Sequence, residues 1–205
     1  MAGNAQSSIL EPQSSAAIFI DRDGTLNEDI GYVATVDQLI LYPWAAEAVR
    51  LINGAGLKAI VVTNQSGVAR GMHTEETLKA IHSTMIEDLA EQGARIDAVY
   101  YCPHHPEIGD SRYRIACKCR KPQTGMLDAA SREHNVDLGG SFVIGDKATD
   151  IQLAHNAGTR AALVLTGYGR QTRAHPEHRS CKPEIVAKNL LEAVKQILDS
   201  DLNRD

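Results

Sequence analysis

Five short apolar runs alternate along the chain with longer helical patterns, and this alternation limits the possible fold more than any other feature. It is typical of a parallel β-sheet covered by helices. The runs are almost uninterrupted by polar residues, as expected for strands buried on both faces. We therefore predict an α/β fold with a parallel sheet flanked by helices. The predicted strands are Ala16–Ile20, Leu57–Val62, Ala98–Tyr101, Ser141–Ile144 and Ala161–Leu165.

Helical patterns separate the predicted strands. The longest helix is opened by Thr74 and ended by Gly93. Its apolar residues recur on one face, which we interpret as core packing. That face consists of Leu78, Ile81, Met85, Ile86 and Leu89. The predicted helices are 44–53, 74–92, 125–134, 149–157 and 184–199, with a loop over 169–183.

Length and charge limit the number of domains and the class of partner. We expect residues 16–205 to form a single domain, because a chain of 205 residues suffices for one well-buried core. Residues 1–15 are polar and lack the pattern of a secretory signal, so we predict a loose tail there. No run is long enough to span a bilayer, and a net charge of -5 argues against a nucleic-acid or anionic-membrane partner. A cytoplasmic protein is expected.

Asp21 and Asp23 directly follow the first predicted strand, in the motif Asp-Arg-Asp-Gly-Thr. Two carboxylates in one loop need a cation or a proton to compensate them. A carboxylate can attack phosphorus when a metal offsets the repulsion between two anions, and a second acid must protonate the leaving oxygen and later activate water. The motif favours Asp21 as nucleophile and Asp23 as general acid and base. For this motif taken alone, a simple Asp-Gly turn is the alternative.

Two other strand ends carry groups that suit a phosphoryl group and a metal ion. Residues 63–66, Thr-Asn-Gln-Ser, offer a hydroxyl and backbone N–H groups for phosphoryl oxygens. Asp146 is the expected third oxygen ligand of Mg²⁺, beside Asp21 and the backbone carbonyl of Asp23. Asp150 lies one helical turn further on. It either orients a metal-bound water or complements the helix dipole, and both readings stay open.

Arg120 and Lys121 precede a predicted helix and supply the positive charge needed to balance the phosphoryl oxygens. Lys121 is expected to act as a point charge on the phosphoryl group, and Arg120 to form a two-pronged contact with substrate. Exposed pairs of this kind are usually only solvated, so this prediction depends on the other motifs.

These four elements, at Asp21, Thr63, Lys121 and Asp146, resemble in their order the haloacid dehalogenase superfamily of phosphatases. The resemblance extends from residue 18 to residue 169. The resemblance implies an α/β fold with a doubly wound, Rossmann-like parallel sheet, catalytic Mg²⁺ and an aspartyl-phosphate intermediate on Asp21. The sequence leaves room only for a minimal cap, so selectivity is expected to come from loops.

Three of the four cysteines lie close to a histidine: Cys102, Cys117 and Cys119 near His104. Such Cys₃His sets are typical of structural zinc sites, since protein ligands fill all four positions. Residues two apart in extended chain face the same way, which favours His104 over His105. We predict a zinc-binding loop that steadies Arg120 and Lys121; reduced cysteines without metal are the alternative.

This cysteine pattern and the stretches 21–32 and 63–71 resemble a narrower family, the heptose bisphosphate phosphatases. The resemblance implies hydrolysis of the C7 phosphate of D-glycero-D-manno-heptose 1,7-bisphosphate to heptose 1-phosphate, for the biosynthesis of nucleotide-activated heptose. It also implies a monomer. The implied substrate contacts are Asp29, Ile30, Gly31, Tyr32, Thr63, Asn64, Gln65, Ser66, Arg120, Lys121 and Lys147.

Three other functions fit parts of the sequence. A histidinol-phosphate phosphatase would carry the same motifs and a similar zinc loop, but a cation such as Arg120 suits a second phosphate better than an ammonium group. A phospho-accepting regulatory domain would use an acidic Mg²⁺ pocket, a Thr and a Lys, but it has no need of Asp23. A zinc-held binding module without activity is disfavoured, because every expected catalytic residue type is present.

Overall fold

The computed structural model describes residues 15–175 and 182–202. Within these residues, six parallel strands form one sheet in the order β3-β2-β1-β4-β5-β6. The predicted α/β class and the parallel sheet are confirmed. The strands are β1 (Ala17–Ile20), β2 (Lys58–Asn64), β3 (Ala98–Cys102), β4 (Phe142–Gly145), β5 (Arg160–Val164) and β6 (Ile185–Ala187).

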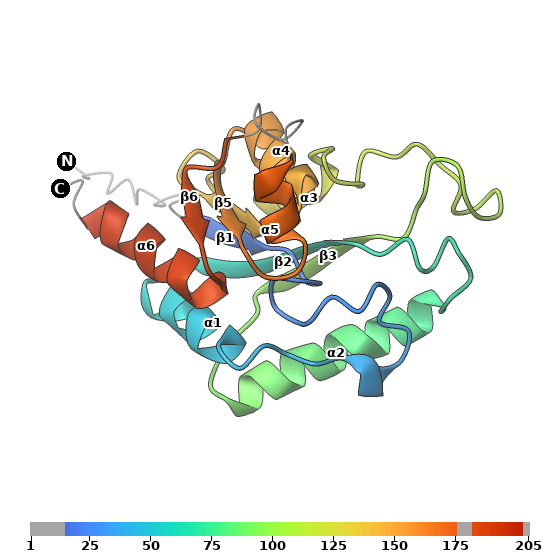
Figure 1. Ribbon diagram of the computed structural model, residues 1–205, viewed down its shortest axis with the longest axis horizontal. Helices are drawn as coiled ribbons and strands as arrows, with labels where there is room; N and C mark the ends of the chain where they lie inside the picture. Colours follow the sequence, from blue (N-terminus) through green and yellow to red (C-terminus); the bar gives the residue numbers. More distant parts are fainter. Residues whose placement is uncertain (1–14, 176–181, 203–205) are drawn as a thin grey trace, which may run out of the picture.

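Helices cover both faces of this sheet (Figure 1). One face packs against α1, α2 and α6, and the other against α3 and α4, with α5 on the same side. A short 3₁₀ helix, η1 (Val36–Gln38), lies in the flap that follows β1. The α-helices are α1 (Ala45–Gly54), α2 (Glu75–Glu91), α3 (Gly125–His134), α4 (Ala148–Ala157), α5 (Gly169–Ala174) and α6 (Leu190–Leu202).

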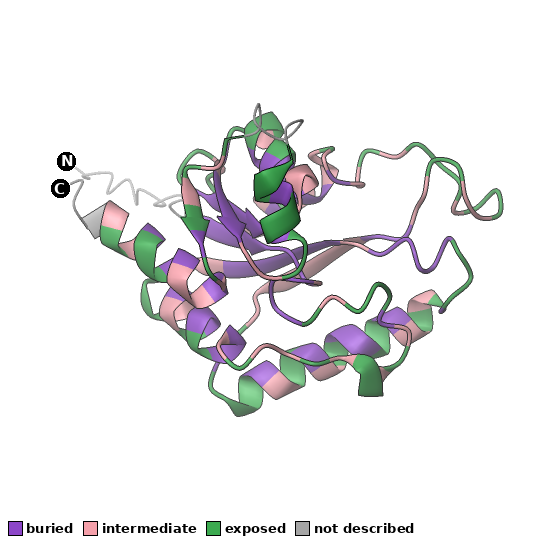
Figure 2. Cartoon of the chain, in the orientation of Figure 1, coloured by how far each residue is buried: buried purple, intermediate pink, exposed green. Residues whose placement is uncertain are grey.

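The alternation of side chains along β1 builds two cores, one on each face of the sheet. Ile18 and Ile20 face α1, α2 and α6, whereas Ala17 and Phe19 face α3 and α4. All four side chains are buried. Figure 2 shows that the central strands β1, β4 and β5 are almost completely buried, whereas the edge strands β3 and β6 are only partly buried.

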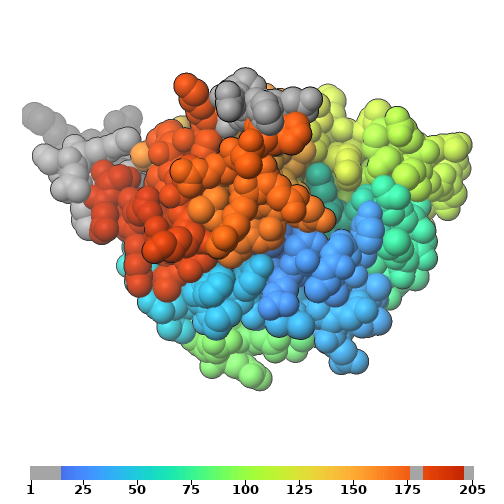
Figure 3. Space-filling model, viewed as in Figure 1, coloured from blue at the N-terminus to red at the C-terminus, as the bar shows by residue number. Residues whose placement is uncertain are grey.

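The strand order reverses on either side of β1, and this reversal positions the candidate site. The chain runs from β1 outward through β2 to β3 and then returns to place β4 on the opposite side of β1. In open parallel sheets, ligands bind at the carboxyl ends of the strands beside such a switch point. The flap (residues 26–42), the loop after β2, the loop after β3 and the segment after β5 gather over this edge of the sheet (Figure 3).

The predicted helix over 184–199 is wrong at its start. Residues 185–187 form β6, which pairs in parallel with β5 (Ala162 with Ile185), and α6 begins only at Leu190. Asn189 Oδ1 accepts a hydrogen bond from Glu192 N (3.0 Å) and so caps the helix. A three-residue edge strand is too short to show its own periodicity beside a long helical pattern.

The predicted loop over 169–183 is also partly wrong. Residues 169–174 form α5, and Thr172 Oγ1 donates to the backbone carbonyl of Asp146 (2.9 Å). This tertiary contact stabilises a helix too short to be recognised from its own sequence. Residues 176–181, with Cys181, lie outside the described part of the chain.

At the other end, Ser15 pairs with Val136 and is not loose, and the rest of the predicted tail lies outside the described residues. Among the helices that the structure describes, none combines the length and the apolar character required to cross a membrane.

The buried face of α2 differs from the predicted face at two positions. Ile86 is 37% exposed, and His82, which the periodicity did not select, is buried at 6% exposed. A polar residue does not register in a hydrophobic pattern even where the core contains it.

Leu78 and Ile86 test this assignment of the α2 faces. Leu78→Ala should lower the free energy of unfolding by about 2–5 kcal/mol, because it opens a cavity under a fully buried side chain. Ile86→Ala, its control on the same helix, should lower it by less than about 1 kcal/mol. Urea unfolding followed by circular dichroism measures both values. Equal losses would contradict the assignment.

Candidate active site

Three buried carboxylates meet at the carboxyl edge of the sheet. Asp21 follows β1, Asp146 follows β4, and Asp150 lies in the first turn of α4. Their exposed fractions are 4%, 0% and 0%, and one oxygen from each lies within 4.8 Å of the other two. The backbone N–H of Asp21 donates to Ile144 O in β4 (2.9 Å), which fixes Asp21 between β1 and β4. The site therefore lies at the point where the strand order reverses.

Lys121 is the buried cation of this cluster. Its Nζ lies 2.7 Å from Asp21 Oδ1 and 2.7 Å from Asp150 Oδ1, and it donates to Val62 O (3.0 Å). Burial alone would lower the pKa of Lys121, but the two carboxylates outweigh burial and raise it. Lys121 is therefore charged and balances part of the negative charge.

Asp146 retains an unsatisfied oxygen. Within the described residues, its buried Oδ1 has no hydrogen-bond partner, and the nearest cation is Lys147 Nζ at 4.0 Å. Burial and the neighbouring Asp21 carboxylate raise the pKa of Asp146 to about 8. Three buried carboxylates face one lysine, and Asp146 Oδ1 is left without a partner among the described residues. Such a group of oxygen atoms suits a hard divalent cation such as Mg²⁺.

Gly24 lets the chain turn tightly against Asp146. Its φ is +88°, a conformation that other residues rarely adopt, and a Cβ at this position would collide with Asp146 Oδ2. A glycine is therefore required at position 24 for two reasons: its backbone conformation and its close approach to Asp146.

Asp23 points to a different set of partners from those of Asp21. Its carboxylate accepts hydrogen bonds from Arg22, Asn27 Nδ2 (3.0 Å) and Gln65 Nε2 (2.7 Å), and Gln65 Nε2 also donates to Thr63 Oγ1 (2.8 Å). Burial raises the pKa of Asp23, but the Arg22 charge and these hydrogen bonds together hold it below its usual value. Gln65 thus joins Asp23 to Thr63, at the end of β2.

A cleft of ≈ 450 Å³ opens beside Lys121. On its wall, Lys147 Nζ donates to Asp29 Oδ2 (2.8 Å) and lies 5.1 Å from the centre of the Tyr168 ring. Burial opposes the charge on Lys147, but the carboxylates of Asp21, Asp146 and Asp29 raise its pKa. The cleft is lined by Asp29, Gly31, Tyr32, Asn64, Ser66, Arg120, Lys121, Lys147, Thr149 and Tyr168.

The cysteines and His104 form a compact cluster beside this cleft. The Sγ atoms of Cys117 and Cys119 are 3.2 Å apart, those of Cys102 and Cys117 are 3.5 Å apart, and His104 Nδ1 lies 3.3 Å from Cys119 Sγ. A tetrahedral zinc site needs edges of roughly 3.5–3.8 Å, so the cluster is close to that shape. His105 is not part of it, because its Nδ1 accepts from the backbone N–H groups of residues 107 and 108.

Two links join this cluster to the cleft. Arg120 Nη1 donates to His104 O (3.2 Å). Asn64, at the end of β2, exchanges two hydrogen bonds with the backbone of Lys121: Nδ2 donates to its carbonyl (3.2 Å), and Oδ1 accepts from its N–H (3.0 Å). The loop therefore holds Arg120 and Lys121 against the end of β2.

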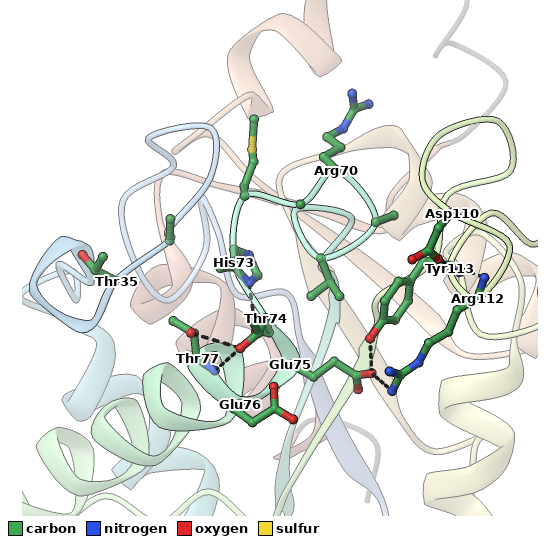
Figure 4. A pocket seen from close by; sticks show the side chains of 15 residues that line it. Thr35, Arg70, His73, Thr74, Glu75, Glu76, Thr77, Asp110, Arg112 and Tyr113 are labelled. Atoms are coloured by element: carbon green, nitrogen blue, oxygen red, sulfur yellow. Dashed lines mark hydrogen bonds and ion pairs between the residues drawn. The ribbon is translucent and has the colours of Figure 1, made fainter.

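A larger cavity, ≈ 830 Å³, lies beyond the cleft at the start of α2 (Figure 4). Glu75 accepts hydrogen bonds from Tyr113 (2.8 Å) and Arg112 (3.3 Å), which tether the cysteine-bearing loop to α2, and from Tyr101 (2.8 Å). Lys121, the cation that contacts Asp21 and Asp150, lines the cleft but not this cavity. Despite its size, it is therefore a poorer candidate for the chemistry than the cleft.

The structure brings most of the predicted site residues to one place. Ile30 is the main exception, since it is 48% exposed and does not line the cleft. Sequence reasoning missed Tyr168 and Thr149, which do line it. The sequence Thr-Gly-Tyr-Gly after the fifth strand was the available signal, because it is a polar cluster at a strand end like the other four. Asp150 accepts from the N–H of Lys147 at the start of α4 (3.0 Å) and also pairs with Lys121. Its role toward a metal-bound water stays a prediction.

Comparison with known proteins gives one consistent result. The chain is 43% identical over 185 residues to the D-glycero-D-manno-heptose-1,7-bisphosphate 7-phosphatase of Thermosynechococcus vestitus, across 88% of this chain and 94% of the relative. It is 45% identical over 157 residues to the D-glycero-beta-D-manno-heptose-1,7-bisphosphate 7-phosphatase of Yersinia pestis, across 76% of this chain and 83% of the relative. The HAD-hydrolase-like family model matches residues 118–193.

Solved structures agree with these sequence matches. The D,D-heptose 1,7-bisphosphate phosphatase of B. bronchiseptica, complexed with magnesium and phosphate, matches with a TM-score of 0.80 and 36% identity, across 90% of this chain and 99% of the other. The corresponding enzyme of Burkholderia thailandensis matches with a TM-score of 0.67 and 28% identity, across 90% of this chain and 99% of the other.

Lys121 tests the charge balance of the carboxylate cluster. In metal-free buffer near pH 8, Lys121→Met should lower the free energy of unfolding by about 3–5 kcal/mol, since it leaves buried carboxylates unpaired. Burial raises the pKa of Asp150, and the charge of Lys121 only partly opposes this rise. Without Lys121, the pKa of Asp150 should therefore rise further. Protonation then relieves the repulsion, and the loss should be smaller near pH 5.

The control for this variant is Lys118→Met, at an exposed position of the same loop. It should change the free energy of unfolding by less than about 0.5 kcal/mol at either pH. A Lys121→Met loss that does not depend on pH, or that equals the control, would contradict the charge-balance account.

Proposed function

This chain belongs to the D-glycero-D-manno-heptose-1,7-bisphosphate 7-phosphatase family of haloacid dehalogenase-like hydrolases, and from that premise we propose its reaction in terms of its own residues. The reaction is hydrolysis of the C7 phosphate of D-glycero-D-manno-heptose 1,7-bisphosphate, which yields heptose 1-phosphate and phosphate. The heptose 1-phosphate would serve the synthesis of nucleotide-activated heptose.

One observation carries this proposal. A carboxylate nucleophile, Asp21, lies beside a buried cation, Lys121, and close to two further carboxylates, Asp146 and Asp150. Lys121 in turn lines a cleft. Arg120 and Lys147 line that cleft, so a second phosphate group would meet positive charge there. A substrate with a phosphate at each end matches this distribution of charge.

Asp21, Asp146 and the backbone carbonyl of Asp23 would hold the Mg²⁺ ion. The open Oδ1 of Asp146 supports this assignment. When bound, the ion reduces the repulsion between the carboxylate and the phosphate and neutralises charge that develops during transfer. Asp150 supports the site by fixing Lys121 and the start of α4.

In the first step, an oxygen of Asp21 attacks phosphorus, and the bond between phosphorus and the C7 oxygen of the sugar breaks. Asp23 donates a proton to that leaving oxygen. Thr63 and Lys121 contact the oxygens of the transferring group, and Lys121 also keeps the Asp21 carboxylate in place.

In the second step, Asp23 takes a proton from a water molecule that attacks the phosphorus of the aspartyl phosphate. The bond between phosphorus and the Asp21 oxygen breaks, phosphate leaves, and the free carboxylate is restored. The first step leaves Asp23 ionised, which is the form that this step requires, and the Arg22 charge and the hydrogen bonds to Asp23 stabilise that form. The same contacts oppose protonation of Asp23, so its role as acid in the first step is proposed from the motif and not from its pKa.

The cleft residues would bind the rest of the substrate. Asn64 and Ser66 line the cleft from the end of β2, and Asp29, Gly31 and Tyr32 line it from the flap. Arg120 and Lys147 supply positive charge. Lys147 is held by Asp29, so its ammonium group is positioned before the substrate arrives. The predicted monomeric state stays a prediction.

We further propose that the Cys₃His cluster binds structural zinc. Its four ligand atoms lie at tetrahedral spacing, and Arg120 is bound to the carbonyl of His104. Zinc would stabilise a loop with little apolar surface and so keep Arg120 and Lys121 in place. Cys102, Cys117 and Cys119 form no disulfide in the described part of the chain, which suits zinc ligands in a reducing compartment, and a cytoplasmic location is proposed on that basis.

The nucleophile and the substrate are tested together. Wild type with Mg²⁺ should release phosphate from heptose 1,7-bisphosphate with a kcat/KM at least about tenfold above that for histidinol phosphate, and Asp21→Asn should lose at least about 10³-fold on the bisphosphate. A preference for histidinol phosphate would overturn the substrate assignment and leave the chemistry intact. An active Asp21→Asn variant would overturn the nucleophile.

Metal analysis of purified protein tests the zinc proposal. We expect about one zinc ion per chain in wild type, and loss of that ion in His104→Asn, because tetrahedral zinc needs its fourth ligand. His105→Asn is the matched control and should keep the ion, since His105 turns away from the cluster. Equal zinc content in the two variants would contradict the assignment of His104.

A further inference from the structure

Arg22 is an unusual residue in the catalytic loop, because its long cationic side chain is completely buried. It lies between Asp21 and Asp23 in sequence, its exposed fraction is 0%, and it does not line the cleft. A buried guanidinium group is unfavourable unless its charge and its N–H donors find partners. Arg22 has such partners, and one of them is Asp23.

Arg22 holds the Asp23 carboxylate with two of its three nitrogens. Nη2 lies 2.8 Å from Asp23 Oδ1 and 2.9 Å from Oδ2, and Nε lies 3.1 Å from Oδ1. Planar guanidinium groups restrict the orientation of a carboxylate that they bind in this way. The plane of the Asp23 carboxylate is therefore set by the position of Arg22.

The third nitrogen of Arg22 is held by His82. Nη1 lies 3.2 Å from His82 Nε2. Since arginine has only N–H donors, His82 Nε2 must be the acceptor, and the ring is neutral. Burial and the Arg22 charge favour the neutral ring as well, because they lower the pKa of His82 to about 3.

His82 is itself fixed by its surroundings. It projects from α2 into the core and is 6% exposed. The centre of its ring lies 5.6 Å from that of Tyr101, whose hydroxyl donates to Glu75 in the first turn of the same helix (2.8 Å). A chain of contacts thus runs from α2 through His82 and Arg22 to Asp23.

We propose that Arg22 and His82 are positioning residues, which together orient the Asp23 carboxylate for proton transfer. The inference rests on the proposed role of Asp23 as general acid and base. Neither residue touches substrate; His82 acts through Arg22, and Arg22 acts through Asp23. A purely structural ion pair is the competing explanation, and the two predict different kinetics.

The test compares two substrates by their kcat/KM, which reports the steps through departure of the leaving group. An alkyl phosphate, heptose 1,7-bisphosphate, needs a proton on its leaving oxygen. An aryl phosphate, 4-nitrophenyl phosphate, has a leaving group that departs without one. Misplacement of the general acid should therefore slow the alkyl substrate selectively.

His82→Leu removes the acceptor for Arg22 and keeps an apolar side chain in the core. We expect it to lower kcat/KM for the alkyl phosphate by about 30-fold and for the aryl phosphate by less than about 3-fold. His82→Gln, whose amide oxygen can still accept from Arg22, should recover the alkyl rate to within about 5-fold of wild type. If His82→Leu does not fold, His82→Asn, whose shorter amide does not reach Arg22, takes its place in the comparison.

Asp23→Asn is the reference variant, because it tests the role of Asp23 separately from the positioning role of Arg22 and His82. If it slows the alkyl phosphate no more than the aryl phosphate, the role of Asp23 is wrong and the inference fails with it. If Asp23→Asn is selective but the His82 variants slow both substrates equally, or neither, the positioning role alone is overturned. A His82→Gln variant as slow as His82→Leu on the alkyl phosphate would overturn the positioning role as well.

Discussion

The contact between Lys121 and the two carboxylates of Asp21 and Asp150 is the interaction on which the rest of the site depends. It buries one positive and two negative charges at the carboxyl edge of the sheet, with a third carboxylate, Asp146, beside them. Such a group is stable only if further positive charge or protons balance it. Burial and the Asp21 carboxylate raise the pKa of Asp146, and a divalent cation bound beside them would offset this excess of negative charge.

Lys121 reaches this position because a loop far from β1 in sequence is held in place at several points. Asn64 clamps the backbone of Lys121, and the Cys₃His cluster and Glu75 secure the preceding residues. The same loop carries Arg120 to the cleft wall. Selectivity for the substrate and charge balance at the nucleophile therefore depend on one segment of irregular structure.

The two carboxylates of the first motif have different environments although they are two residues apart. Asp21 contacts Lys121 and lies close to Asp146 and Asp150, whereas Asp23 is held by Arg22, Asn27 and Gln65. Different surroundings give equivalent side chains different roles. The contacts of Asp23 extend through Arg22 to His82 of α2, so the position of its carboxylate is coupled to the packing of that helix.

The sequence by itself determined the sheet, five of its six strands and the strand ends at which polar residues gather, because apolar periodicity and strand-end motifs are local features. It did not reveal β6 or α5, which are too short to have a recognisable pattern and form through contacts with β5 and Asp146. Nor did it reveal His82, since burial of a polar side chain depends on a partner distant in sequence. Only the tertiary structure decided which charges meet, because the distances between Asp21, Lys121 and Asp146 follow from the strand order.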